Sequence, residues 1–217
     1  MSYNETYNLA IGLMPSVATL SKDVVTIPSY YITYLDVLQP KELEMLLGFC
    51  RLSESDFQPS EVTGKASDYR KSLVMFDPPV FREFFVSQVY RRLPEIFNLL
   101  GIAPFQPSEI ETQLTASGHG DYFKPHTDSG TGDTETRMIT YVYYFGSHQF
   151  SGGELKLWDT KVINGVADKG ENPEVITPIA NSMIVFKSDT WHEVQPVVNP
   201  DGGFMDSRFT VNGWIRR

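Results

Sequence analysis

The sequence predicts a mainly β protein, a sandwich or jelly roll braced by N-terminal helices. Two helical patterns are confined to the N-terminal half, and after Pro104 short strand-like runs follow one another with no helical pattern between them. Of the 217 residues, 41% are hydrophobic and 13% are aromatic, which suffices for a sizeable core. This length fits a single domain, 1–217. We expect residues 1–104 to support a β core formed by residues 105–217.

The N-terminal half begins with residues 1–20, which have no clear periodicity and are expected to form a loose arm. The stretch from Val24 to Leu35 is rich in Val, Ile, Tyr and Thr and predicts a strand broken near Pro28. A helix is predicted from Pro40, because the first helical turn tolerates proline. Its apolar stripe recurs at helical spacing at Leu43, Leu46, Leu47 and Cys50. Cys50 is therefore expected to be a small core residue.

A second helix is predicted to start near Pro79 and to stop at Gly101. Its stripe is apolar and rich in aromatic side chains: Phe81, Phe84, Phe85, Val89, Leu93, Ile96, Phe97 and Leu100. Pro94 lies inside this pattern and is expected to kink or split the helix, because proline removes a backbone donor.

The segments after Pro104 are enriched in β-branched and aromatic residues and are separated by clusters of Gly, Asp, Asn and Pro. The predicted strands are Glu109–Ala116, Tyr122–His126, Arg137–Phe145, Glu154–Trp158, Glu174–Thr177, Ser182–Phe186, Glu193–Val197 and Arg208–Ile215. One long polar loop, Asp159–Pro173, is expected among them.

Charge and cysteine content exclude several classes of protein. Eighteen basic and 27 acidic residues give a net charge of −9, which argues against non-specific binding to nucleic acid or to an anionic membrane. A single cysteine excludes an internal disulfide and any multi-cysteine metal site. The start of the chain lacks the pattern of a secretory signal, and no apolar run is long enough to span a bilayer. A cytoplasmic monomer or homodimer is expected.

Two of the four histidines open a His-x-Asp triplet, His119-Gly120-Asp121 and His126-Thr127-Asp128. On a strand, residues i and i+2 point the same way, so either triplet could bring an imidazole and a carboxylate to one metal ion. His192, which stands between two predicted strands, is the natural third ligand. Two histidines and one carboxylate are the ligand set of non-haem Fe(II) sites with open positions.

The segments around these residues decide between the triplets. Tyr122–Ser129 resembles the first metal motif of the prolyl 4-hydroxylase-like iron(II)/2-oxoglutarate dioxygenases. Four further segments resemble, in order, the next core strand, the glycine turn, the second metal motif and the cosubstrate strand of that family: Arg137–Phe145, Ser151–Leu155, Trp191–Pro196 and Arg208–Trp214. Residues 105–217 are similar to the family throughout, and Tyr69-Arg70-Lys71-Ser72 resembles a family segment near the substrate entrance.

The resemblance implies a double-stranded β-helix, a cupin-like jelly roll with the N-terminal helices packed on its major sheet. It also implies that His126, Asp128 and His192 hold Fe(II), and that the enzyme uses O2 and 2-oxoglutarate, with ascorbate as a candidate reductant. The far carboxylate of 2-oxoglutarate would require a buried cation, for which Arg208 is the candidate. Tyr144 and Asn212 are the other candidate cosubstrate contacts.

Hydroxylation of an unactivated C–H bond is the implied reaction, and the intact Asp128 favours it over halogenation, since related halogenases have a small residue there. A prolyl residue of a protein or peptide is the first expected substrate, and a free amino acid or small metabolite is the alternative. Tyr69, Arg70 and Trp214 are the candidate substrate contacts. Many members of that family carry a tyrosine near the cosubstrate, some nine or ten residues before the first metal histidine. This sequence has Ala116-Ser117 in that region instead. The alternative of another class is a non-catalytic cupin-like barrel, which would have no use for a buried Arg208.

Overall fold

The computed structural model describes residues 9–10, 24–60, 68–78, 81–146 and 149–217. Its helices are α1 (Pro40–Leu52) and α2 (Arg82–Leu99), with short 3₁₀ turns at Glu54–Asp56, Gly132–Thr134 and Phe204–Asp206. The strands before Asp128 are β1 (Leu9–Ala10), β2 (Val24–Ile27), β3 (Tyr31–Leu35), β4 (Gln58–Pro59), β5 (Arg70–Lys71), β6 (Leu73–Phe76), β7 (Glu109–Ile110), β8 (Gln113–Ser117) and β9 (Tyr122–His126). The later strands are β10 (Arg137–Phe145), β11 (Ser151–Gly152), β12 (Leu155–Ile163), β13 (Val166–Ile176), β14 (Ser182–Lys187), β15 (Trp191–Val194), β16 (Val197–Val198) and β17 (Arg208–Arg216).

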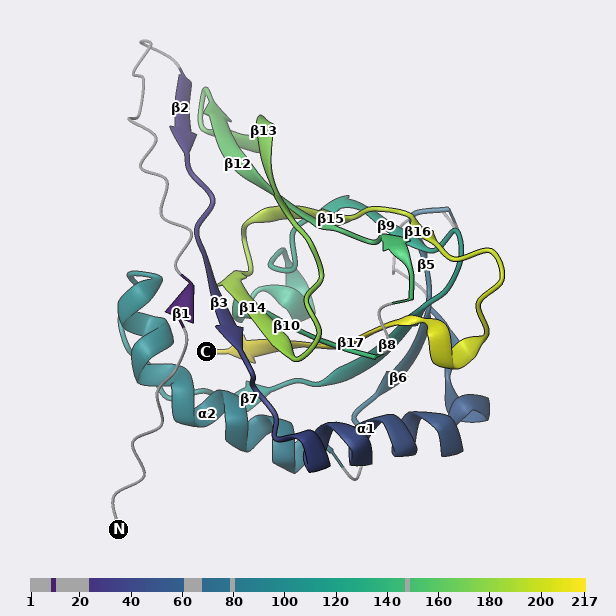
Figure 1. The fold of residues 1–217 in the computed structure, drawn as a ribbon. Coiled ribbons are helices and arrows are strands. Elements are labelled where there is room, and N and C mark those ends of the chain that lie inside the picture. Colours follow the sequence, from purple (N-terminus) through teal and green to yellow (C-terminus); the bar gives the residue numbers. More distant parts are fainter. Residues whose placement is uncertain (1–8, 11–23, 61–67, 79–80, 147–148) are drawn as a thin grey trace.

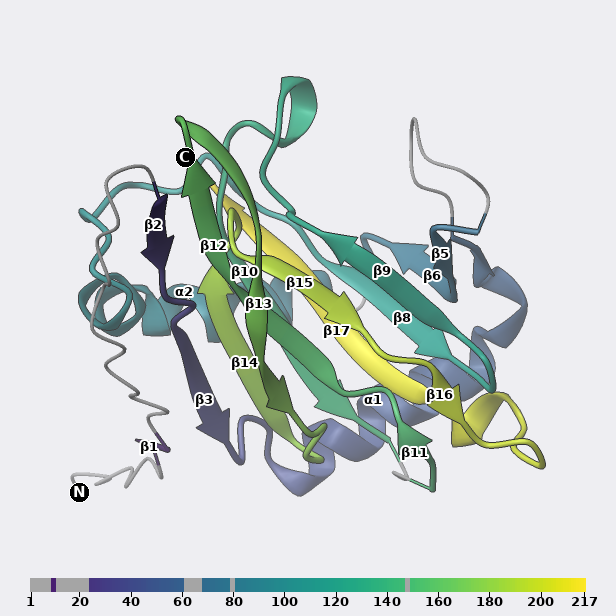
Figure 2. The ribbon, with the colours of Figure 1, turned by 90° about the horizontal axis from the view of Figure 1, so that it is seen from above.

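Two antiparallel sheets face each other, as Figures 1 and 2 show from two directions. The larger sheet has the strand order β1-β3-β14-β10-β17-β8-β6-β4, with β7 paired to β17. The smaller sheet has the order β13-β12-β15-β9-β5, with β2 paired to β12. This arrangement confirms the predicted mainly β, double-stranded β-helix fold.

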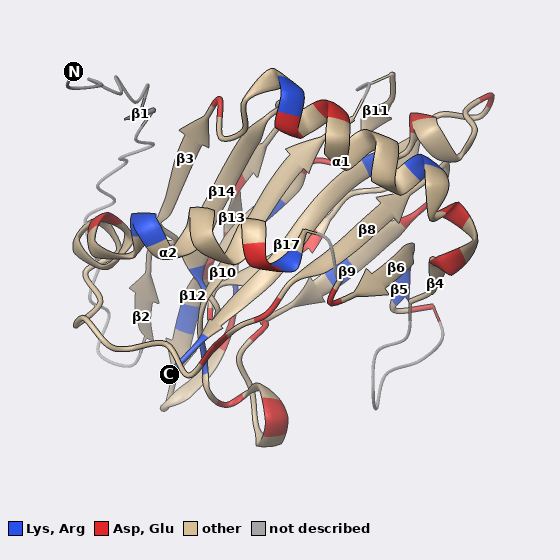
Figure 3. Ribbon diagram, turned by 90° about the horizontal axis from the view of Figure 1, so that it is seen from below, with Lys and Arg blue, Asp and Glu red and all other residues tan. Residues whose placement is uncertain are grey.

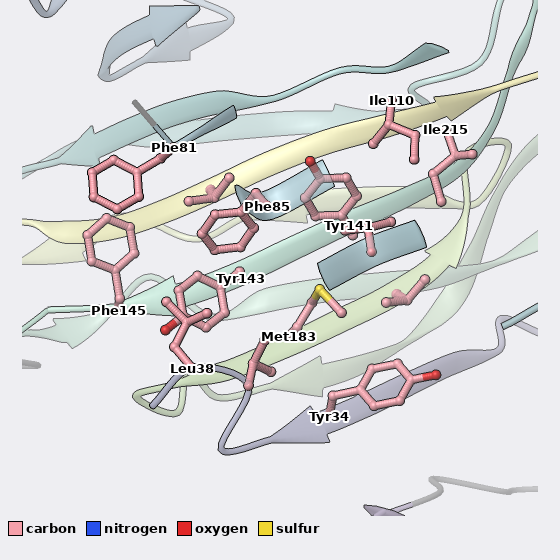
Figure 4. Close-up of a cluster of buried hydrophobic side chains, with 14 of the residues drawn as sticks. Tyr34, Leu38, Phe81, Phe85, Ile110, Tyr141, Tyr143, Phe145, Met183 and Ile215 are labelled. Atoms are coloured by element: carbon pink, nitrogen blue, oxygen red, sulfur yellow. The ribbon is translucent and has the colours of Figure 1, made fainter. Parts of the chain in front are cut away.

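One face of the larger sheet is toward the helices and the other is toward the smaller sheet. Alternate side chains of β10 point to these two faces, because a strand has a period of two residues. Tyr141, Tyr143 and Phe145 belong to a core cluster shared with side chains of α1 and α2, among them Leu46 and Phe85. Figure 4 shows this cluster, in which the Phe85 and Tyr143 ring centroids are 5.0 Å apart. Residues of β10 on the opposite face belong to a second cluster between the sheets, together with residues of β12, β13 and β14: Val142, Tyr144, Leu155, Leu157, Ile176, Ile184 and Phe186.

Both helices carry charged residues of both signs, which lie toward the two ends of α1 and at the start and in the second half of α2 (Figure 3). The apolar stripe predicted for α1 is confirmed by the burial of Leu46 and Cys50. Helix α2 is continuous through Pro94, so the expectation that this residue splits it is wrong. The predicted start near Pro79 lies outside the described residues, and the chain after α2 turns at Gly101, where φ is +61°. None of the helices in the described ranges is long and apolar enough to cross a membrane.

The prediction of a long polar loop at Asp159–Pro173 is wrong, because this segment forms the outer part of the β12–β13 hairpin. Asn164 and Gly165 form its turn with φ values of +50° and +78°. An Asn-Gly pair favours such positive φ values and is a strong hairpin signal. The predicted strand Glu174–Thr177 is therefore only the end of β13. The loose arm expected at residues 1–20 lies outside the described residues, except for the two residues of β1.

Candidate metal centre and adjoining pocket

An open cavity of about 580 Å³ lies between the two sheets. This volume includes space that is open to solvent. Its wall is formed by residues of both sheets and of the segments that join them: Arg70, Ser72, Gln113, Thr115, Ser117, Tyr122, Phe123, His126, Asp128, Thr140, Val142, Leu155, His192, Val194, Arg208, Thr210, Asn212 and Trp214. Most of the exposed wall is therefore apolar or neutral, with a small set of charged groups.

Strand pairing brings the three predicted metal ligands together. His126 ends β9 and lies directly opposite His192 of β15, and Asp128 follows two residues later. Their candidate ligand atoms all lie within 4.8 Å of one another. Nε2 of His126 is 3.6 Å from Asp128 Oδ1, and Nε2 of His192 is 3.3 Å from Asp128 Oδ2. This is a two-histidine, one-carboxylate cluster that leaves one side open to the cavity.

Backbone carbonyl groups orient both imidazole rings. Nδ1 of His126 is 2.8 Å from the Lys124 carbonyl oxygen, and Nδ1 of His192 is 2.9 Å from that of Thr190. Because a carbonyl oxygen only accepts, each Nδ1 carries the proton and donates it. Each Nε2 is then left with the lone pair that a metal ion needs, as is common in metal sites.

A threonine holds the carboxylate ligand. Thr140 of β10 is buried and donates its hydroxyl to Asp128 Oδ2 at 2.8 Å, and the Asp128 amide donates to the Ser188 carbonyl oxygen. Thr140 was not among the predicted site residues. The alternation of β10 could have revealed it, because Thr140 is on the same strand face as Val142 and Tyr144.

The charges of His126 and Asp128 suit metal binding, whereas at His192 burial is outweighed by the Asp128 carboxylate, which raises the pKa of this imidazole. Burial and the neighbouring His192 lower the pKa of His126 to about 4, so this imidazole is neutral near pH 7. Burial opposes ionisation of Asp128, but the two histidines outweigh it and hold the pKa of the carboxyl well below its usual range. A neutral imidazole and an ionised carboxylate are the forms that bind a metal ion.

A second set of polar side chains lies around Arg208, the first residue of β17. Arg208 is only 3% exposed, and its Nε donates to the Gly153 carbonyl oxygen at 2.8 Å. Its Cζ stands 5.0 Å from the centre of the Tyr144 ring. Three buried polar atoms here have no hydrogen-bond partner among the described residues: Arg208 Nη2, Tyr144 Oη and Thr210 Oγ1. Leaving such groups unpaired is costly, which indicates that a ligand with anionic oxygens completes this site. A dicarboxylate cosubstrate fits that requirement.

The glycine turn before β12 makes room for Arg208. At Gly153 φ is +67°, and a Cβ atom there would lie 2.6 Å from Arg208 Cδ. Glycine is therefore needed for two reasons, the positive φ and the close approach of the arginine side chain. The glycine turn of the Ser151–Leu155 motif thus leaves the space that the Arg208 side chain occupies.

The remaining predicted residues divide between the cavity wall and other places. Arg70, Asn212 and Trp214 line the cavity, and Asn212 Nδ2 donates to Thr115 Oγ1 at 2.8 Å. Tyr69 does not line it. Its hydroxyl donates instead to the Pro125 carbonyl oxygen at 2.6 Å, next to the metal-ligand segment.

The rival triplet lies outside this site. His119 is exposed, and its Nδ1 accepts a hydrogen bond from the Asn199 amide. Asp121 accepts from the Gly118 amide and forms an ion pair with Lys71. The structure therefore does not bring the His119-Gly120-Asp121 triplet to the cluster.

Comparison with known proteins agrees with this geometry. Residues 112–216 match the model of the 2OG-Fe(II) oxygenase superfamily. An uncharacterized PKHD-type hydroxylase from Synechocystis sp. is 39% identical over 213 residues, which are 95% of this chain and 70% of that protein. A prolyl-4-hydroxylase from Pseudomonas putida has a TM-score of 0.63 and 21% identity, with 86% of this chain and 92% of that one covered. A prolyl hydroxylase from Trichoplax adhaerens, solved with a peptide fragment of the hypoxia inducible factor oxygen degradation domain, has a TM-score of 0.64 and 16% identity, covering 86% and 83%.

Proposed function

Because this chain belongs to the 2OG-Fe(II) oxygenase superfamily and is a 2-oxoglutarate-dependent dioxygenase, we propose that it hydroxylates an unactivated C–H bond of a prolyl residue in a protein or peptide. Fe(II), 2-oxoglutarate and O2 together supply the oxidising power, with one oxygen atom going to the substrate and the other to succinate as CO2 is lost. The protein contributes binding, orientation and exclusion of water.

In this proposal His126, Asp128 and His192 hold the iron. The convergence of their ligand atoms within 4.8 Å supports it, as do the backbone carbonyls that fix both imidazole tautomers. With three protein ligands, a bound iron ion would have coordination positions left for the cosubstrate and oxygen. Thr140 is a positioning residue, because its hydroxyl fixes one oxygen of the carboxylate ligand.

Arg208 would bind the far carboxylate of 2-oxoglutarate, with Tyr144 and Thr210 as neutral donors beside it. The single observation that carries this assignment is the buried, unpartnered Arg208 Nη2 in the same cavity as the histidine–aspartate cluster. A barrel that bound only a metal ion would leave this guanidinium nitrogen unpaired at a considerable cost. The observation therefore favours the oxygenase over a non-catalytic cupin-like barrel.

Apolar side chains would shield the reaction from bulk water. Phe123 stacks on the His126 ring with centroids 3.6 Å apart, and Phe186 meets His192 edge to face at 4.9 Å. Val142, Leu155 and Val194 complete the apolar part of the wall. Such surroundings strengthen the electrostatic contacts of the bound carboxylates.

The choice of a prolyl substrate rests on likeness to the two prolyl hydroxylases and to the PKHD-type relative. A free amino acid or small metabolite is the second candidate, and the guanidinium of Arg70 in the cavity favours it. The two candidates share one chemistry and differ in the size of the molecule that carries the reacting carbon.

Succinate formation tests the proposal. Purified enzyme would be incubated with Fe(II), 2-oxoglutarate and air, and with either blocked proline-containing peptides or free amino acids. We expect substrate-dependent release of succinate and a product that has gained one oxygen atom. The variant Asp128→Ala should lose this activity, while His119→Ala should retain it. Failure of the wild-type protein both to bind 2-oxoglutarate and to release succinate with any substrate would overturn the proposed function.

A further inference from the structure

The cavity contains a second guanidinium group, that of Arg70 on β5. Register with β9 places Arg70 opposite Phe123, and its Cζ lies 4.9 Å from the centre of that ring. Its hydrogen bonds go only to neutral hydroxyls, from Nε to Ser72 Oγ at 3.1 Å and from Nη2 to Thr115 Oγ1 at 3.4 Å. No acidic group in the described part of the chain forms an ion pair with it. Three of its five N–H donors therefore have no hydrogen-bond partner among the described residues.

Two other residues of the cavity wall have hydrogen-bond donors without a partner in the described part of the chain. Gln113 and Trp214 line the cavity, and Gln113 Nε2 and Trp214 Nε1 are buried and have no acceptor among the described residues. Indole and guanidinium groups can only donate. Among the described residues of the wall, Asp128 is the one acidic group. A molecule that fills this space must therefore bring its own acceptor oxygens.

Charge counting indicates what kind of acceptor fits. Burial lowers the pKa of Arg70 to about 10, which still leaves it charged at neutral pH. With the cofactors bound, iron and the two guanidinium groups contribute four positive charges, while Asp128 and the two carboxylates of 2-oxoglutarate remove three. Among the groups that line the cavity and the cofactors, one positive charge is left over. Arg70 is half-buried, and a charge partly removed from water is unfavourable without a counter-charge.

We propose that Arg70 forms a second anion subsite and binds a carboxylate that the substrate carries close to its reacting carbon. This inference rests on the proposed function, and it restricts the substrate to a singly anionic molecule or segment. The carboxylate could belong to a chain-terminal residue or an N-acylated amino acid, or to an acidic side chain beside a prolyl residue, whereas a free amino acid is a zwitterion with no net charge. A neutral peptide carbonyl would satisfy a donor of Arg70 but would leave the extra charge uncompensated.

Binding of matched probes tests the inference. The Fe(II) enzyme with 2-oxoglutarate would be titrated without oxygen, by calorimetry, with N-acetyl-L-proline and with its neutral amide. A second pair, N-acetyl-L-glutamyl-L-prolinamide and its glutaminyl counterpart, places the carboxylate on a side chain. We expect the acid of one pair to bind roughly tenfold or more tightly than its neutral partner. Preference in the first pair identifies a terminal carboxylate, and preference in the second pair identifies an acidic side chain.

Variants assign the preference to Arg70. The substitution Arg70→Gln should remove the preference for the acid and leave the affinity of the neutral probe within about threefold. Arg70→Lys should keep part of the preference, because it keeps the charge. Arg82→Gln on the surface of α2 is the matched control and should change neither affinity.

Two outcomes would overturn the subsite. One is equal or absent binding of acid and neutral probe in both pairs, and the other is a preference for the acid that persists in Arg70→Gln. The affinity for 2-oxoglutarate separates these results from failure of the proposed function. If the wild type and Arg70→Gln both bind 2-oxoglutarate normally, only the carboxylate subsite is wrong.

Discussion

Replacement of Arg208 by glutamine should weaken the binding of 2-oxoglutarate while leaving iron in place. The arginine is 3% exposed, its Nε is already engaged with Gly153, and its buried Nη2 has no hydrogen-bond partner among the described residues. Hydrogen bonds between charged partners contribute about 1.5–3 kcal/mol, which corresponds to a roughly ten- to hundredfold loss of affinity. The true loss should lie toward the upper limit, because the far carboxylate would be left buried without a counter-charge.

The assay is a titration of the Fe(II) enzyme with 2-oxoglutarate in the absence of oxygen. A second titration would use 2-oxopentanoate, which keeps the chelating 2-oxo acid and lacks the far carboxylate. Because Arg208 is assigned to the far carboxylate alone, Arg208→Gln should change the affinity for 2-oxopentanoate by no more than about threefold. Iron content and thermal unfolding of the variant serve as controls for folding.

The reasoning would be refuted if Arg208→Gln weakened both ligands equally, since the arginine would then act on the metal centre or on the fold. It would also be refuted if neither affinity changed. In that case the unpartnered nitrogen of Arg208 would need another ligand.

Three further predictions concern single residues. Thr140→Val should lower the affinity for Fe(II) by about tenfold, because the carboxylate ligand loses its hydroxyl donor; unchanged affinity in a metal titration would contradict this role. Gly153→Ala should destabilise the fold by about 1–3 kcal/mol and weaken 2-oxoglutarate binding. Gly165→Ala is the control, because Gly165 also has a positive φ but lies in open space. It should destabilise the fold by no more than Gly153→Ala does and leave 2-oxoglutarate binding unchanged. Denaturant unfolding and cosubstrate titration measure both effects, and equal cosubstrate affinities would argue against the contact with Arg208. Burial raises the pKa of the Cys50 thiol to about 12, so a thiol reagent at pH 8 should react with it only on unfolding, and fast labelling of the native protein would show that the residue is accessible.

The sequence alone was sufficient to predict the burial or direction of a side chain where the backbone period of a single strand or helix determines it. The stripe of α1 predicted the burial of Cys50, and the spacing of His126 and Asp128 predicted a shared direction. The alternation of β10 likewise separates Tyr143, on the helix side, from Tyr144, near Arg208. Each of these depends on a backbone period that neighbouring elements do not alter.

The sequence alone was not sufficient to predict a side-chain contact where the pairing of distant strands determines which residues meet. Thr140 reaches Asp128 because β10 and the end of β9 are brought together from opposite sheets. The alternation of β10 indicates the face on which Thr140 lies but does not specify Asp128 as its partner. Tyr69 adjoins Arg70 in the chain, but its hydroxyl binds the Pro125 carbonyl oxygen while Arg70 lines the cavity. Polar composition also obscured the β12–β13 hairpin, although Asn164-Gly165 marks its turn.

The most direct test of the metal centre is the amount of Fe(II) that binds to each chain in anaerobic equilibrium dialysis. We predict one iron ion per chain for the wild type and for His119→Ala, and a large loss of binding for His126→Ala, Asp128→Ala and His192→Ala. Iron binding that disappears in His119→Ala but persists in His126→Ala would contradict the account.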